Sequence, residues 1–192
     1  MAIRKFSQSL DNGDTMGAIL AINEVDINRP YQGINGHTPL TYATKVGNMS
    51  VVTALIGKNA DVNARGGQKG MSPLHIAVYL ENKDIVRMLI NIRADINALD
   101  NLGRLPLHHA VISGAEDAVR MLLSAGSLVD VPDIEYRWTP LHLAAYYGYT
   151  EIVELLIRHG ATTHMKDING AVPEDIAKSK SYEGVTSVLQ QT

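Results

Sequence analysis

Apolar residues occur along the chain in short groups that repeat with helical spacing. Ile85-Val86 is followed by Leu89-Ile90, and Ile152-Val153 is followed by Leu155-Leu156. This spacing places the apolar side chains on one face of a helix and leaves the opposite face polar. The pattern predicts amphipathic helices near residues 49–57, 83–91, 116–124 and 150–158.

A second kind of apolar run begins with a helix-start signal. In Thr139-Pro140-Leu141-His142, the threonine hydroxyl can accept a bond from an N–H of the first turn, and proline suits the first helical position. The phrase recurs in full or degraded form, with prolines at 39, 73, 106, 140 and 173 that are 34, 33, 34 and 33 residues apart. A period near 33 residues indicates a repeat array, with further helices near 39–46, 73–80, 106–113 and 140–147.

The repeating units also close in the same way. The endings are Ala60-Asp61-Val62-Asn63 and Ala94-Asp95-Ile96-Asn97, and a glycine such as Gly148 separates the two helices of a unit. Together with the Thr-Pro-Leu-His phrase, these features resemble the ankyrin repeat over essentially the whole chain. The resemblance implies an all-α solenoid in which each repeat is a helix-turn-helix with a β-hairpin-like loop. It places a single ankyrin-repeat domain over 1–192, with an N-terminal capping repeat at 1–32, repeats at 33–66, 67–99, 100–133 and 134–166, and a C-terminal capping repeat at 167–192.

Several residues depart from the repeat pattern. Arg93 replaces the glycine that follows an outer helix, and arginine accepts a left-handed backbone less readily than Asn59 at the same place, so we expect this turn to differ. Loops 65–70 and 133–137 each carry one extra residue and should differ in shape from the other loops. Leu105 lacks the capping hydroxyl of its unit, which costs about 1 kcal/mol.

Composition limits the classes of partner. With 45% hydrophobic residues and one Phe, the core must be mainly aliphatic. The net charge of −3, from 17 basic and 20 acidic side chains, supplies no basic stripe for nucleic acid. The absence of cysteine excludes disulfides and thiolate metal sites and fits a reducing compartment. No run approaches the roughly 20 apolar residues of a membrane span, so we expect a soluble, cytoplasmic protein that binds no membrane.

The histidines do not form a catalytic or metal-binding pattern. His75, His108 and His142 occupy the same slot in successive units, which favours a structural role for a buried imidazole. The adjacent His108-His109 pair points in two directions about 100° apart on a helix and cannot chelate one ion well. The glycine-rich loop 66–70 lacks the Gly-Lys-Ser/Thr ending of a phosphate-binding loop. We therefore predict no catalytic, metal or cofactor residues and a non-enzymatic protein.

The resemblance also implies where a partner would bind. In ankyrin repeats, hairpin loops and inner helices line a concave face. This places the residue two before each proline at a loop tip, and the residues six and seven after it at the groove end of the inner helix. The predicted protein-binding residues at these positions are Met71, Tyr79, Leu80, Arg104, Ile112, Trp138, Tyr146 and Tyr147. Trp, Tyr and Arg dominate binding energy at protein interfaces, so the prediction is a protein partner of unknown identity.

The sequence also permits other interpretations. An ankyrin-only chain is typical of an adaptor or a stoichiometric inhibitor, and we expect it to be monomeric when free. A self-associating scaffold is the main alternative, which light scattering over a concentration series would distinguish. A laboratory-designed binder and an enzyme that uses the histidines are weaker alternatives. The irregular framework and uneven repeat lengths favour a natural sequence.

Overall fold

A computed structural model describes residues 2–191 of the chain. Across these residues the regular structure is helical, apart from isolated bridges that pair Tyr31 with His37 and Gly66 with Met71. The chain divides into two compact units, the first ending at Asp95 and the second beginning at Ile96. The prediction of an all-α fold built from helix pairs is confirmed.

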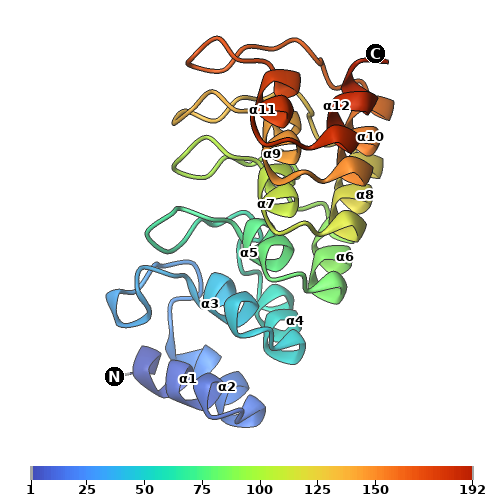
Figure 1. The fold of residues 1–192 in the computed structure, drawn as a ribbon. Helices are drawn as coiled ribbons and strands as arrows, with labels where there is room; N and C mark the ends of the chain where they lie inside the picture. Colours follow the sequence, from blue (N-terminus) through green and yellow to red (C-terminus); the bar gives the residue numbers. More distant parts are fainter. Residues whose placement is uncertain (1, 192) are drawn as a thin grey trace. The chain divides into compact units, whose positions relative to one another are not determined.

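The first unit contains three helix pairs. Its helices are α1 (Ala2–Asp11), α2 (Thr15–Ala21), α3 (Pro39–Val46), α4 (Met49–Gly57), α5 (Pro73–Tyr79) and α6 (Lys83–Asn91), with short 3-10 helices at Ile22–Glu24 and Gln32–Ile34. The inner helix α3 packs between α1 and α5, and the outer helices α2 and α4 contact each other (Figure 1). The first unit therefore has two helical layers, with α1 and α2 as the terminal pair.

The second unit repeats this arrangement. Its helices are α7 (Pro106–Ile112), α8 (Glu116–Ser124), α9 (Pro140–Tyr147), α10 (Thr150–Arg158), α11 (Pro173–Ser179) and α12 (Glu183–Leu189). The inner helices α7, α9 and α11 stack in order, as do the outer helices α8, α10 and α12 (Figure 1). The loop before each inner helix extends from the helical layers as a hairpin (Figure 1), which we call a finger.

The helix-start signals act as predicted. The hydroxyls of Thr38, Ser72 and Thr139 each accept a bond from the backbone N–H three residues later, and proline occupies the first helical position. Leu105 makes no side-chain cap, but its N–H donates to Nδ1 of His108 at 3.0 Å. The predicted helix limits agree with the observed ones to within one residue, because prolines and left-handed residues mark their ends.

The prediction that the turn at Arg93 differs from the turn at Asn59 was wrong. Arg93 has a φ of 61°, close to the 63° of Asn59. In both turns the next residue, Ala94 or Ala60, donates its N–H to the outer-helix carbonyl five residues earlier at 3.0 Å. These bonds and the burial of both alanines outweigh a left-handed penalty of about 1–2 kcal/mol.

The fingers differ in length as their sequences predict. The backbone closes between Asp100 and Arg104 in one finger, and between Asp133 and Trp138, one residue further apart, in the next. Gly66 and Met71 are paired across the same longer interval. The extra residues at 65–70 and 133–137 therefore enlarge their turns without changing the stacking of the helices that follow.

The repeat ending that reads Asp-x-Asn joins neighbouring repeats within each unit. The last side chain of the ending, an Asn or Asp, accepts the backbone N–H of the equivalent loop one repeat later. The pairs are Asn28 with Asp61 at 2.8 Å, Asn63 with Asp95 at 2.8 Å, Asn97 with Leu128 at 3.0 Å, and Asp130 with Thr162 at 2.9 Å. The periodicity of these residues therefore reflects a repeated inter-repeat hydrogen bond.

Candidate protein-binding surface

Each finger of the second unit is organised by a buried aspartate. Asp100, Asp133 and Asp167 are 4%, 1% and 6% exposed. In each case Oδ1 accepts two backbone N–H groups of its own finger, at distances between 2.8 and 3.1 Å. The carboxylate therefore fixes the backbone of the turn from the inside.

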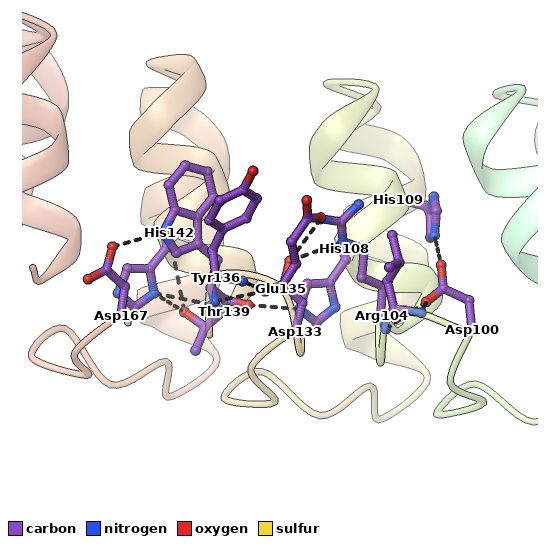
Figure 2. Close-up of polar contacts among 12 residues, drawn as sticks. Asp100, Arg104, His108, His109, Asp133, Glu135, Tyr136, Thr139, His142 and Asp167 are labelled. Carbon is purple, nitrogen blue, oxygen red and sulfur yellow. Dashed lines mark hydrogen bonds and ion pairs between the residues drawn. The ribbon is translucent and has the colours of Figure 1, made fainter. Parts of the chain in front are cut away.

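The second oxygen of each aspartate accepts a bond from a side chain. Oδ2 of Asp133 accepts from Nε and Nη2 of Arg104 at 3.1 and 2.9 Å, and Arg104 also reaches Glu135 at 3.2 Å (Figure 2). The indole N–H of Trp138 donates to Oδ2 of Asp167 at 3.0 Å. Since Arg104 and Trp138 each belong to the preceding finger, these bonds tether the fingers in series.

The first of these aspartates pairs instead with a buried histidine. Nε2 of His109 lies 2.9 Å from Oδ2 of Asp100 (Figure 2). Burial alone would raise the pKa of Asp100, but the hydrogen bond with His109 and the backbone N–H donors outweigh it and lower the pKa to about 2. The pKa of Asp167 is lowered in the same way, against burial, by the indole of Trp138 and two backbone N–H groups. Both groups are therefore carboxylates at neutral pH.

The structure corrects the expected position of the residue two before each inner-helix proline. Arg104 and Trp138 close the hairpin at its returning end and do not form its tip, because their carbonyls accept the N–H groups of Asp100 and Asp133. The side chain of Arg104 is 17% exposed. These two predicted binding residues therefore also hold the fingers together.

An unbroken series of aromatic rings runs from the second finger of this unit, past the end of α9, to the residue before α10. Ring centroids are separated by 5.3 Å between Tyr136 and Trp138, 5.0 Å between Trp138 and Tyr146, 5.2 Å between Tyr146 and Tyr147, and 5.6 Å between Tyr147 and Tyr149. These spacings are typical of favourable aromatic pairs. We call these five residues the aromatic surface.

Two members of the aromatic surface face solvent extensively. Tyr136 is 43% exposed and Tyr147 is 38% exposed, whereas Trp138 and Tyr146 are half-buried beside them. The ammonium of Lys180 lies 4.4 Å from the ring centroid of Tyr146, a cation–π geometry. The half-buried rings thus support the exposed tyrosines and limit their freedom before any partner arrives.

The remaining predicted binding residues lie in other places. Ile112 is half-buried at the end of α7 in the second unit. In the first unit, Tyr79 and Leu80 are 46% and 47% exposed at the end of α5, and they line one pocket together with Met71. The structure therefore brings Trp138, Tyr146 and Tyr147 into one cluster and places Met71, Tyr79 and Leu80 in another.

The repeated histidines have the structural role that their periodicity predicts. His75, His108 and His142 are fully buried, and Nδ1 of each accepts the backbone N–H of the residue before its proline. Among residues 2–191, no group of three or more His, Cys, Asp or Glu side chains is placed to hold a metal ion. In the same range, no helix combines the length and apolar character required to cross a membrane.

Sequence reasoning missed the three aspartates that organise the fingers. Their spacing of 33 and 34 residues was a readable signal, since it follows the repeat period. Tyr136 and Tyr149 lie outside the loop and helix positions from which the binding residues were predicted. The contact between Lys180 and Tyr146 could not be predicted from the residues around Lys180, because it depends on the stacking of α11 against α9.

Comparison with known proteins identifies the family of this chain. The profile described as "Ankyrin repeats (3 copies)" matches residues 7–100 and 92–167. The human 2-5A-dependent ribonuclease is 45% identical over 51 residues, covering 27% of this chain and 7% of the ribonuclease. The mouse protein phosphatase 1 regulatory subunit 12A is 39% identical over 67 residues, covering 35% of this chain and 6% of the subunit. The mouse inhibitor of Bruton tyrosine kinase is 39% identical over 46 residues, covering 24% and 3%. The chain thus matches less than a tenth of the length of each of these relatives.

Proposed function

Because the chain belongs to the ankyrin-repeat family, whose repeats are protein–protein interaction modules, we propose that it is a non-enzymatic module that binds a partner protein through the aromatic surface. Contact would centre on Tyr136 and Tyr147, with Trp138 and Tyr146 as the supporting layer. The partner acts in the cytoplasm with this chain, in keeping with the absence of cysteine.

The observation that carries this proposal is the aromatic surface itself. Tyr136 and Tyr147 remain about two-fifths exposed although each lies next to other aromatic rings. Tyrosine supplies a large apolar contact area and a polar hydroxyl, and it loses little conformational entropy on binding. Neighbouring ring centroids are 5.0–5.6 Å apart, so the rings pack against one another. These side chains therefore lose little further conformational freedom when a partner binds.

The names of two relatives suggest a more specific role for this chain. One is named as a regulatory subunit of protein phosphatase 1, and another as an inhibitor of Bruton tyrosine kinase. A role as an adaptor or stoichiometric inhibitor would require the chain to occupy a partner's surface without doing chemistry itself. The buried, backbone-bonded imidazoles of His75, His108 and His142 agree with such a role.

Affinity capture from a native lysate tests the proposal. We expect a bait carrying Tyr136→Ala and Tyr147→Ala to retain at least about tenfold less partner than the wild-type bait, because truncating a hot-spot tyrosine costs about 2 kcal/mol or more. Quantitative mass spectrometry measures the ratio. Both side chains are exposed, so circular dichroism should show unchanged helicity in the variant.

Leu128→Ala is the matched control for this capture experiment. Leu128 is 53% exposed in the loop after α8, and its loss should leave the partner bound. Equal retention by the tyrosine variant and the control would contradict the proposed surface. Sedimentation of the wild-type protein over a concentration series completes the test, since self-association abolished by the tyrosine variant would assign the surface to a second copy of the chain.

A further inference from the structure

The first unit contains a pocket that the proposed function does not use. Its volume is about 420 Å³, within the range of small-ligand pockets. One wall comes from the finger that closes between Gly66 and Met71, and another from the ends of α3 and α5. The predicted binding residues Met71, Tyr79 and Leu80 all line it.

The pocket is lined by both apolar and basic side chains. Ile76, Met71 and Leu80 supply apolar surface, whereas Lys45 and Lys69 supply ammonium groups. Among the described residues that line the pocket, none is Asp or Glu. This local charge is opposite in sign to the net charge of −3 of the whole chain.

The two lysines are available to an incoming anion. Both are exposed, and neither has a carboxylate within ion-pair distance in the described part of the chain. The ammonium of Lys69 lies 5.9 Å from the ring centroid of Tyr79, so an aromatic face orients it. Burial, and then the charge of Lys45, lower the pKa of His37, so that the imidazole is neutral at pH 7 and the lysines carry the charge.

The wall of the pocket is held rigidly. Gly67 donates its N–H to the carbonyl of Gly36 at 2.9 Å, and Gly66 and Met71 exchange two backbone bonds. Gly67 has a φ of +72°, and a Cβ there would lie 2.7 Å from Cε1 of His37. The glycine therefore allows the two fingers to approach closely, and a ligand would meet a preformed site.

We propose that this pocket binds an acidic peptide segment of a partner protein, with an apolar side chain seated against Ile76 and Leu80 and neighbouring carboxylates paired with Lys45 and Lys69. The inference goes beyond the proposed function, because it concerns a site in the other unit and does not depend on the aromatic surface. The apolar lining favours such a segment over a free phosphate, which would leave the apolar side chains uncovered. Charge complementarity also favours it over a basic or neutral segment.

Selection of short random peptides displayed on phage against the full-length protein tests this inference. We expect the recovered peptides to be enriched in Asp and Glu next to Leu, Ile or Phe, and the enrichment to fall as salt is raised. Lys45→Gln with Lys69→Gln should weaken binding of a recovered peptide about threefold to thirtyfold, since exposed charge pairs contribute modestly. Fluorescence anisotropy with a labelled recovered peptide measures this change.

A charge-reversed variant distinguishes a loss of the binding site from a loss of the folded protein. Selection against Lys45→Glu with Lys69→Glu should recover basic peptides, a change of sign that an unfolded protein could not produce. Lys58→Glu with Lys83→Glu, on the outer helical layer of the same unit, is the charge-matched control and should still recover acidic peptides. Recovery without acidic enrichment, or with the same acidic enrichment after reversal, would overturn the proposal.

The aromatic-surface variant separates the two proposals. Tyr136→Ala with Tyr147→Ala should select the same acidic peptides as the wild type. Loss of that selection would place the peptides on the aromatic surface and overturn the pocket, whereas loss of partner capture alone concerns only the proposed function.

Discussion

Replacing Asp133 by alanine is expected to lower the free energy of unfolding of the second unit by about 3–5 kcal/mol, the usual cost of breaking a buried ion pair from one side. The carboxylate is buried and accepts bonds from the guanidinium of Arg104 and from the N–H groups of Tyr136 and Trp138. Its removal takes the acceptor from the two backbone N–H groups, and it takes the buried carboxylate from a guanidinium that is only 17% exposed. Urea unfolding followed by the fluorescence of Trp138, the one tryptophan in the chain, measures the loss.

Glu135→Ala provides the comparison for this experiment. Glu135 pairs with the same guanidinium, but its side chain is 45% exposed, so its loss should cost at most about 1 kcal/mol. A loss at Asp133→Ala no larger than that at Glu135→Ala would show that the buried aspartate does not organise the fingers.

The stability of the second unit should fall as the pH is lowered from about 7 towards 4. Burial lowers the pKa of His108 to about 4 against the opposing effects of the Trp138 carbonyl and Asp133, and burial also lowers the pKa of His142. The unfolded chain therefore binds protons below about pH 6.5 that the folded chain excludes, which destabilises the fold. For His108 alone, the difference corresponds to about 3 kcal/mol at 1.36 kcal/mol per pKa unit.

Urea titrations at a series of pH values measure this dependence. His108→Gln should reduce the pH slope by close to one proton near pH 5, whatever its effect on stability at pH 7. Asp100 acts in a separate window, because its pKa of about 2 is below its unfolded value and its contribution is lost only below about pH 4. A free energy of unfolding that is constant between pH 7 and 5 would contradict the neutral, buried state of His108.

The fold was predictable because its determinants are local. Proline at the first helical position and a capping hydroxyl define the start of a helix whatever packs against it, as at Thr139-Pro140. The failure at Arg93 shows the limit of this reasoning. A backbone preference of about 1–2 kcal/mol was overruled by a helix-ending hydrogen bond and a buried alanine that the repeat supplies.

The site was less predictable because its contacts join residues about one repeat apart. Arg104 and Trp138 are of the residue types favoured at interfaces, yet each donates to an aspartate 29 residues further along the chain. The 34-residue spacing of Arg104 and Trp138 reflects their bonds to the next finger, so this spacing does not by itself indicate a binding role. The exposure of Tyr147 was predictable, because the resemblance places the end of the inner helix on the open side of the repeat.

Photo-crosslinking at position 147 tests the central claim most directly. Tyr147 is replaced by p-benzoylphenylalanine, and the captured partner is irradiated with the full-length protein. A covalent adduct is expected at position 147 and not when the same group replaces Leu128, although Leu128 is the more exposed of the two. A partner that still binds but crosslinks only at position 128 would contradict the assignment of the aromatic surface as the binding site.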